Sequence, residues 1–386
     1  MAVEIRTREA IRSWMFDQAL PFWAAHGLDR EHGGYVEQLN LDGSDASVDF
    51  KRTRVAGRQV YVFSHAARMG WNASSQLAET GIAFLTERAW LGPDKGFARL
   101  TTRDGRVLDP TADLYDLAFV LFAFSWRHRA MKDQHSLTWM HRTLDFIEQH
   151  MRHPGGLGFW HQLPPEGFRL QNPHMHLTEA CLAAFEATGE QRFADHAKAL
   201  VKLFQTKFFD AASGTLAEYF NDDWSRADGE DGRVTEPGHQ LEWAWILNSA
   251  RKLLGIDTAA EIRATIAFAE RHGVDQRTAV TYNSVRDDGM AIDRGSRTWP
   301  NTERLKAAVA LYELDGVDPA PVIDSTVELL LQRYLSDEPP GTWIDAFDEK
   351  GESESKTIPA STLYHVFLAF AEVLRISEPS SANGAT

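Results

Sequence analysis

Stretches that are apolar on nearly every face alternate along the chain with stretches that are apolar on one face only. Residues 114–124 and 363–370 illustrate the first kind, which is typical of helices packed on all sides. Residues 191–206 illustrate the second, because apolar residues recur there at helical spacing among charged ones. The pattern predicts twelve helices, near residues 7–26, 55–70, 75–90, 111–129, 135–151, 174–188, 191–206, 238–255, 258–272, 300–314, 319–335 and 360–376. The alternation indicates an inner and an outer set.

Three local signals repeat along the chain at intervals of 57 to 65 residues. Prolines near expected helix starts form one series: Pro110, Pro173, Pro237, Pro300 and Pro359. Turn glycines form a second: Gly43, Gly105, Gly167, Gly232, Gly289 and Gly351. Short strand-like pieces led by an aromatic residue precede most of these turns: Tyr35, Phe97, Phe159, Tyr282 and Trp343. Series that interleave in this way indicate an internal repeat.

Each repeat therefore contains an inner helix, an outer helix and a short β-hairpin. Six such units in a closed ring predict an all-α fold, an (α/α)6 barrel of twelve helices with short hairpins in its loops. We expect one catalytic domain over residues 1–376 and a disordered tail over 377–386, which is poor in apolar residues. The alternative is an open α-solenoid whose concave surface binds protein, although solenoid repeats are usually shorter.

Composition narrows the classes of partner. A net charge of −15 argues against nucleic acid, whose phosphates would be repelled. Cys181 is the one cysteine, so neither an intramolecular disulfide nor a cysteine metal cluster can form. No apolar run approaches the roughly 18 residues of a membrane span. We therefore expect a cytoplasmic monomer or homodimer that acts on a small molecule and has no membrane partner.

The first turns of the inner helices carry polar residues in phase with the repeat. These residues are Arg58, Tyr115 with Asp116, His176, His239, Glu303 and His365. If the inner helices start at one mouth of the barrel, their side chains meet there and form one site. A single histidine in such a helix is more often a buried imidazole bonded to a backbone carbonyl. Three histidines in register favour a functional role. Arg58 could either bind a substrate oxygen or pair with Asp113 or Asp116.

His-x-x-Glu occurs twice in phase, as His176 with Glu179 and His239 with Glu242. A carboxylate one helical turn away can bond one imidazole nitrogen and leave the other free to take a proton. His239 also follows Pro237 at an expected helix start, where the helix dipole disfavours an imidazolium. The sequence thus predicts a neutral base at His239, oriented by Glu242.

The sequence predicts neither a metal site nor a nucleotide cofactor. The His-x-x-Glu order is the reverse of the di-iron helical pattern, and neither His-Glu-x-x-His nor a phosphate-binding glycine loop occurs. Among the tryptophans, Trp299 beside Pro300 and Trp343 in a hairpin are the candidates to floor a sugar cavity. Residues 221–236, rich in Asp and Gly, are the candidate lid.

Histidines near neutral pKa can remove and return a proton, which for an open-chain sugar points to an enediol intermediate. Return of the proton to C1 converts an aldose to a ketose, and return to the other face of C2 epimerises it. A glycoside hydrolase on the same barrel would need two carboxylates about 5–10 Å apart. Candidates for that pair are Asp113, Asp116, Glu218, Glu303, Asp345 and Asp348. A non-enzymatic scaffold is a fourth alternative.

Several local motifs, in order and in phase, resemble the N-acylglucosamine 2-epimerase superfamily, which includes cellobiose 2-epimerases, mannose isomerases and sulfoquinovose isomerases. The motifs are Gly33-Gly34-Tyr35, Arg58, Asn172-Pro-His-Met-His176, Pro237-Gly-His239 with Glu242-Trp243, Trp299-Pro300, and Tyr364-His365. They extend from about residue 33 to residue 365.

The resemblance implies an (α/α)6 barrel that acts without metal or redox cofactor. It implies that His365 removes the C2 proton and that His239 with Glu242 assists ring opening. His176 and Arg58 would polarise the substrate oxygens, while Glu303 and Trp299 would contact the sugar. The overall pattern is closest to the isomerase branch, so we expect D-mannose to D-fructose, and D-lyxose to D-xylulose as a reaction of the same type. The alternative is a sugar 2-epimerase. A phosphate or sulfonate on C6 would need basic groups at the mouth, which the sequence does not locate.

Overall fold

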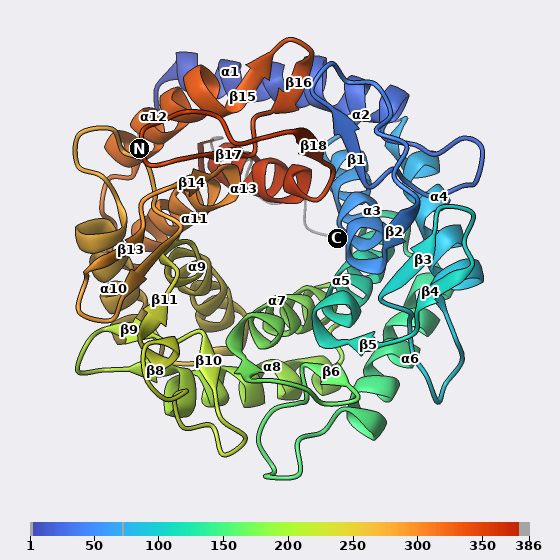
Figure 1. Ribbon diagram of the computed structural model, residues 1–386, viewed down its shortest axis with the longest axis horizontal. Coiled ribbons are helices and arrows are strands. Elements are labelled where there is room, and N and C mark those ends of the chain that lie inside the picture. Colours follow the sequence, from blue (N-terminus) through green and yellow to red (C-terminus); the bar gives the residue numbers. More distant parts are fainter. Residues whose placement is uncertain (1–2, 72, 378–386) are drawn as a thin grey trace.

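Six helices rich in apolar residues form the inner ring of the computed structural model, which describes residues 3–71 and 73–377. They are α3 (Thr53–Arg68), α5 (Leu114–Met131), α7 (Gln171–Thr188), α9 (Pro237–Leu254), α11 (Thr298–Asp315) and α13 (Thr362–Ser377). Each contacts its two neighbours, and α13 packs back against α3 to close the ring (Figure 1). Because these helices are covered on every side, they have little need for a polar face.

An outer ring of amphipathic helices covers the inner one (Figure 1). Its members are α1 with η1 and α2 (Ile5–Ser13, Trp14–Ala19, Leu20–His26), α4 with η2 (Ser74–Phe84, Leu85–Ala89), α6 (Gln134–His150), α8 with η3 (Gln191–Leu203, Phe204–Phe208), α10 with η5 (Ala259–Phe268, Ala269–Gly273), and α12 with η6 (Ala320–Leu329, Leu330–Tyr334). In α8 the buried side chains include Phe193, Ala197, Leu200 and Val201, which form one helical face. The predicted (α/α)6 barrel is confirmed, with the predicted alternation of inner and outer helices.

Short strands lie between the helices, and six of their ladders join one repeat to the next. The strands are β1 (Gln38–Asn40), β2 (Phe50–Arg52), β3 (Leu100–Thr102), β4 (Val107–Asp109), β5 (Ala112–Asp113), β6 (Gln162–Leu163), β7 (Arg169–Leu170), β8 (Phe209–Asp210), β9 (Thr215–Leu216), β10 (Tyr219–Phe220), β11 (Val234–Thr235), β12 (Ser284–Arg286), β13 (Ala291–Asp293), β14 (Ser296–Arg297), β15 (Leu335–Asp337), β16 (Pro340–Trp343), β17 (Ala346–Phe347) and β18 (Thr357–Pro359). The strand before each inner helix pairs with a strand of the next unit: β2 with β3, β5 with β6, β7 with β10, β11 with β12, β14 with β17, and β18 with β1. Hairpins inside one unit, such as β3–β4, also occur. The ladders therefore hold the starts of successive inner helices at one mouth.

The first and last parts of the described chain meet in this ring. Strand β1 pairs with β18, with Leu39 opposite Ile358. Below them, Arg8 of α1 donates from Nη1 to the carbonyl oxygen of Ser377 at 3.3 Å. Of the predicted tail, Ser377 is the last residue of α13, and residues 378–386 lie outside the described part. Within the described ranges, no helix combines the length and apolar character that a membrane crossing requires.

Candidate active site

The side chains predicted from the repeat do gather where the inner helices begin. Arg58, His176, His239, Glu303 and His365 are all at least nine-tenths buried. They come from five different inner helices and belong to one connected set of contacts. The ladder before each helix fixes where the helix starts, so each first-turn residue points to the same place.

His365 is held between an acidic and a basic partner. Its Nδ1 lies 2.9 Å from Oε1 of Glu303, and its Nε2 lies 3.4 Å from Nη2 of Arg58. Because a guanidinium only donates, Nε2 accepts and the ring proton sits on Nδ1, which donates to the carboxylate. Burial, reinforced by the charges of Arg58 and Lys306, lowers the pKa of His365 well below its ordinary value. His365 is therefore a neutral imidazole whose Nε2 faces a cation.

Arg58 lies among aromatic rings and has no carboxylate partner among the described residues. Its Nη2 donates to the hydroxyl of Tyr115 at 2.6 Å, and its guanidinium lies 4.4 Å from the ring centre of Phe119 and 5.1 Å from that of Tyr364. Its Nε is buried without a partner. Arg58 therefore does not pair with Asp113 or Asp116, which was one of its two predicted roles. Asp116 instead pairs with Arg54 at 2.8 Å and accepts from the Arg54 backbone N–H at 3.2 Å, so it supports the start of α3.

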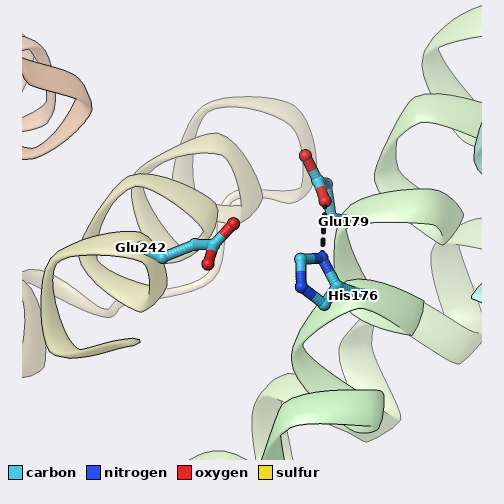
Figure 2. Close-up of side chains that lie close together, drawn as sticks. All are labelled: His176, Glu179 and Glu242. Atoms are coloured by element: carbon cyan, nitrogen blue, oxygen red, sulfur yellow. Dashed lines mark hydrogen bonds and ion pairs between the residues drawn. The ribbon is translucent and has the colours of Figure 1, made fainter. Parts of the chain in front are cut away.

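His176 is oriented by Glu179, as the His-x-x-Glu spacing predicts. Nδ1 of His176 lies 3.1 Å from Oε2 of Glu179, and the hydroxyl of Tyr364 donates to the same carboxylate at 2.7 Å. Figure 2 shows the Glu242 carboxylate, from the neighbouring helix, pointing toward the His176 ring. Burial lowers the pKa of His176 to about 3, although the charge of Glu242 opposes this. His176 is thus a second neutral imidazole, packed edge-on against Tyr115.

His239 has a different partner from the one predicted. Its Nδ1 lies 2.9 Å from Oε2 of Glu218, which sits between β9 and β10, and 3.7 Å from Glu236. Burial pulls the pKa of His239 down, but the charges of Glu218 and Glu236 outweigh it and raise the pKa to about 10. The helix does start at Pro237, yet two carboxylates outweigh its dipole. His239 is an imidazolium at neutral pH, not the neutral base expected, and Glu242 is not its partner.

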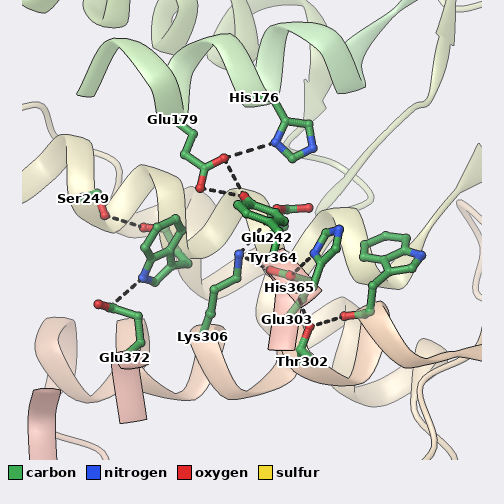
Figure 3. Close-up of polar contacts among 12 residues, drawn as sticks. His176, Glu179, Glu242, Ser249, Thr302, Glu303, Lys306, Tyr364, His365 and Glu372 are labelled. Carbon is green, nitrogen blue, oxygen red and sulfur yellow. Dashed lines mark hydrogen bonds and ion pairs between the residues drawn. The ribbon is translucent and has the colours of Figure 1, made fainter. Parts of the chain in front are cut away.

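Glu242 belongs instead to a buried cluster around Lys306. Nζ of Lys306 lies 2.5 Å from Oε2 of Glu303 and 3.4 Å from Oε1 of Glu242. Figure 3 shows this lysine between the carboxylates and close to the Tyr364 ring. Oε2 of Glu242 is buried without a hydrogen-bond partner. The cluster links His365, through Glu303, to Glu242 on α9.

Trp299 lies between the protonated His239 and the neutral His365. Its ring centre lies 5.1 Å from that of His239 and 5.4 Å from that of His365, and the Arg297 guanidinium lies 5.4 Å from it on another side. This indole therefore lies beside both histidines, and its predicted role as the floor of a sugar cavity stays a prediction.

Trp343, the second tryptophan expected there, lies elsewhere. It is 1% exposed and stacks on Trp23 of α2 at 5.0 Å. Its place in the repeat matches those of Tyr35, Phe97 and Phe159, which are also buried. Trp343 therefore packs inner against outer elements and is not a substrate-contacting residue.

Three groups of side chains have the composition of metal ligands: His176 with Glu179 and Glu242, Glu218 with Glu236 and His239, and Glu242 with Glu303 and His365. In the third group, Lys306 already supplies a positive charge between two of the carboxylates. The same ammonium lies beside Glu242 of the first group, and the imidazolium of His239 occupies the second. A divalent cation at these places would have to displace the ammonium or the proton that already lies between the carboxylates. His174, two residues before His176, is a buried imidazole. Its two ring nitrogens bond the backbone carbonyl oxygen of Leu170 and the backbone N–H of Phe159.

The candidate lid, residues 221–236, is tied to the next repeat. Arg233 contacts Asp287 and Asp288, each at 2.7 Å, and Arg226 contacts Asp287 at 3.2 Å. Val234 and Thr235 form β11 of a three-stranded sheet. Any opening of this segment would break these contacts, so its ends at least are fixed.

Lys306, Tyr364 and Glu218 are members of the site that sequence reasoning did not assign to it. The sequence offers Glu218 only as a candidate hydrolase carboxylate. It lies 21 residues before His239, so helical spacing does not indicate their contact. A signal for Lys306 was present: a lysine in an otherwise apolar inner helix, three residues after Glu303. Of the hydrolase candidates, neither Glu218 nor Glu303 is free to act as a hydrolytic acid, because Glu218 binds His239 and Glu303 binds both Lys306 and His365.

The arrangement can transfer protons at two places. A neutral imidazole beside a guanidinium can remove a proton from carbon while the cation stabilises the developing oxyanion. An imidazolium on the other side of one indole can donate a proton to oxygen.

Comparison with known proteins gives a consistent result. A family model described as N-acylglucosamine 2-epimerase matches residues 33–369. The chain is 34% identical over 371 residues to a mannose-6-phosphate isomerase of Rhizobium meliloti, covering 94% of this chain and 95% of the relative. It is 29% identical over 340 residues to a D-mannose isomerase of Thermobifida fusca, covering 80% of each. A solved cellobiose 2-epimerase of Bacillus thermoamylovorans superposes with a TM-score of 0.87 over 97% of this chain and all of that one, at 20% identity, which supports the fold alone.

Proposed function

Because the chain belongs to the N-acylglucosamine 2-epimerase family, we propose that it is an aldose–ketose isomerase that converts D-mannose to D-fructose. The reaction proceeds by ring opening, removal of the C2 proton and return of a proton to C1 through a cis-enediol. The isomerase relatives at 34% and 29% identity favour this outcome. The side chains of the chain itself supply the acid, the base and the oxyanion contact.

The observation that carries the proposal is the environment of His365. Nδ1 of His365 keeps its proton and donates a hydrogen bond to Glu303, so the lone pair of Nε2 points to where Arg58 presents its guanidinium. A base so placed can take the C2 proton while Arg58 stabilises the negative charge that develops on the neighbouring sugar oxygen. The low pKa of His365 keeps it unprotonated over the neutral range.

Ring opening and proton transfer between oxygens fall to the other two histidines. His239, an imidazolium paired with Glu218, donates a proton to the ring oxygen. His176, neutral and oriented by Glu179, accepts a proton from a sugar hydroxyl. Trp299 gives the sugar an apolar face to lie on, between His239 and His365.

The test is turnover of a panel of free aldoses in deuterium oxide, followed by NMR. Mannose should give fructose that carries solvent deuterium at C1, and lyxose should give xylulose. His365→Gln keeps a neutral polar side chain but lacks the base, so we expect kcat to fall by about 100-fold or more. Unchanged melting temperature would show that the variant is folded.

Retention of wild-type kcat by His365→Gln would refute this assignment of the base. Glucose with deuterium at C2 as the main product would instead identify a 2-epimerase, the alternative that the name of the family favours. Release of reducing ends from an oligosaccharide, without any isomerised product, would point to a glycoside hydrolase.

A second candidate substrate is mannose 6-phosphate, because the relative with 34% identity bears that name. Arg297 has the position for a phosphate contact. Its side chain is 43% exposed, its guanidinium lies 5.4 Å from the Trp299 ring centre, and its ion pair with Glu236 is long at 3.8 Å. Parallel measurements of kcat/KM for mannose and mannose 6-phosphate distinguish the two substrates.

A further inference from the structure

Lys306 is a fully buried lysine that contacts none of the three histidines. Its ammonium lies 2.5 Å from Glu303, 3.4 Å from Glu242 and 4.6 Å from the ring centre of Trp245. The Tyr364 ring centre is 6.0 Å away. In Figure 3 the lysine rises from its helix into the middle of this group, on the far side of Glu303 from His365. A lysine in such a place is costly unless nearby negative charge requires it.

Three carboxyl groups create that requirement. Glu179, Glu242 and Glu303 come from three inner helices, and none is more than 4% exposed. Burial, reinforced by the charge of Glu242, raises the pKa of Glu303 well above its ordinary value, and Lys306 opposes this rise through its charge and its hydrogen bond. Without the ammonium, Glu303 would be the group to take up a proton.

The state of Glu303 decides the state of His365. An ionised Glu303 accepts the Nδ1 proton of His365 and leaves Nε2 as the base. A protonated Glu303 carries a proton that can be donated to Nδ1 instead, which moves the imidazole proton to Nε2 and blocks the base. The Lys306 ammonium contacts Glu303 on the side opposite His365. Through this carboxylate it thus selects the reactive tautomer of His365.

We propose that Lys306 is a positioning residue that keeps Glu303 ionised and thereby holds His365 in its base form. The inference rests on the proposed function in which His365 is the base, but its electrostatic part does not depend on the substrate. Lys306 acts in place of an external cation for the cluster of Glu179, Glu242 and Glu303. Its role is to fix charge, and it makes no contact with the substrate.

The test compares Lys306→Met, which keeps the apolar stem and removes the charge, with Lys306→Arg, which keeps the charge. Lys306→Met should lower kcat by about 100-fold, as expected when a general base is lost, and change KM less than about threefold. Lys306→Arg should recover most of kcat. A role in packing alone would lower the apparent kcat only through the folded fraction and would leave KM unchanged.

The pH profile supplies the decisive readout. Glu303 is faced by Lys306 of its own helix, Glu242 of α9, Glu179 of α7 and His365 of α13. Activity requires Glu303 ionised, so loss of Lys306 should move the acidic limb of kcat to higher pH. Nitrogen-15 NMR of the histidine rings should show the proton of His365 moving from Nδ1 to Nε2 in Lys306→Met. A wild-type limb and a wild-type ring signal in this variant would overturn the inference.

Failure of the proposed function would look different. A wild-type protein that isomerises no aldose would refute that function, while the NMR comparison would still report whether Lys306 sets the His365 tautomer. If Lys306→Met does not fold, Lys306→Ala with methylammonium replaces it. Methylammonium should restore the Nδ1 proton signal and kcat, whereas an equal concentration of sodium chloride should not, and equal effects of the two salts would overturn the inference.

Discussion

His239 and His365 occupy equivalent positions in the repeat and contact the same indole, yet they differ in charge. His239 faces Glu218 and Glu236, whereas His365 faces Arg58 and has Lys306 behind its carboxylate. The local partners thus keep one ring protonated and the other neutral, as the proposed acid and base require. Two protonation states side by side are what an isomerisation needs, because one proton leaves carbon while another reaches oxygen.

Removal of the Glu218 carboxylate tests the charge of His239. The pKa of His239 is raised from 6.5 to about 10. Its pairing therefore contributes stability that is fully present below about pH 6.5 and is lost as pH rises through about 10. Glu218→Gln should lower the free energy of unfolding at pH 6.5 by about 3 kcal/mol and make the decline between pH 6.5 and 10 smaller, because only Glu236 then pairs with His239. Denaturant titrations at several pH values measure both effects.

A matched control for this prediction is Glu186→Gln. Glu186 pairs with Arg129 at 2.8 Å but is 43% exposed, so its loss should cost less than about 1 kcal/mol and leave the pH dependence unchanged. A decline between pH 6.5 and 10 in Glu218→Gln as large as that of the wild type would contradict the assignment of the charge to His239.

For single residues, the sequence predicted the positions of the site side chains better than their hydrogen-bond partners. The repeat interval located Arg58, His176, His239 and His365 because it reports where inner helices start. The partner of His239 could not be read from spacing, since a carboxylate from the preceding hairpin competes with the one a helical turn away. The orienter of His176 was predicted because it lies on the same helix.

The helices are positioned by close packing of α3 against α5, and Gly57 is the point of contact. A Cβ at Gly57 would lie 2.7 Å from the carbonyl oxygen of Phe119 and 2.9 Å from its carbon. These are backbone atoms, so the two helices would have to move apart. Arg58 follows directly in the chain, and the packing therefore sets how far its guanidinium reaches toward His365.

Gly57→Ala should destabilise the protein by about 2 kcal/mol, as overpacking commonly does, and should also lower kcat per folded molecule. Gly81→Ala is the matched control. A Cβ there would meet the side chains of Tyr35 and Val60 at 2.4 and 2.5 Å, between α4 and α3, on the outer side of α3. Gly81→Ala should destabilise the protein but leave kcat per folded molecule near the wild-type value. Thermal melting combined with active-site-normalised kinetics checks this, and equal losses of kcat in both variants would argue against a local effect on Arg58.

The helices themselves could be predicted because their periodicity extends over many residues. The predicted starts at Pro173 and Pro300 lie two residues inside α7 and α11, since these prolines occupy the first turn rather than its first position. Strand pairing could not be predicted. Ladders of two or three residues between different repeats carry almost no sequence signal. Of the aromatic residues predicted to lead strands, Trp343 lies at the end of β16, whereas Tyr35, Phe97 and Phe159 form single β-bridges.

In the whole molecule, each repeat contributes one side of a ring and one side chain or pair to the site. The site is therefore incomplete in any single unit: His365 of α13 needs Glu303 of α11 and Arg58 of α3. The in-phase spacing predicted the ring, because an open array would leave the first and last of these residues far apart. It could not predict how the ring closes, which depends on the pairing of β1 with β18.

That closure makes the order of the repeats a cycle, so the position of the chain ends should be exchangeable. Joining Ser377 to Val3 by a short flexible linker, and opening the chain between Gly155 and Gly156, gives a circular permutant. The end of α13 contacts α1 through the bond from Arg8 to Ser377, and residues 154–156 are exposed. Exposed loops of this kind are where permutation is generally tolerated. We expect native circular dichroism and kcat within about threefold of the wild type, and a permutant that folds but lacks activity would show that the original break in the backbone matters to the site.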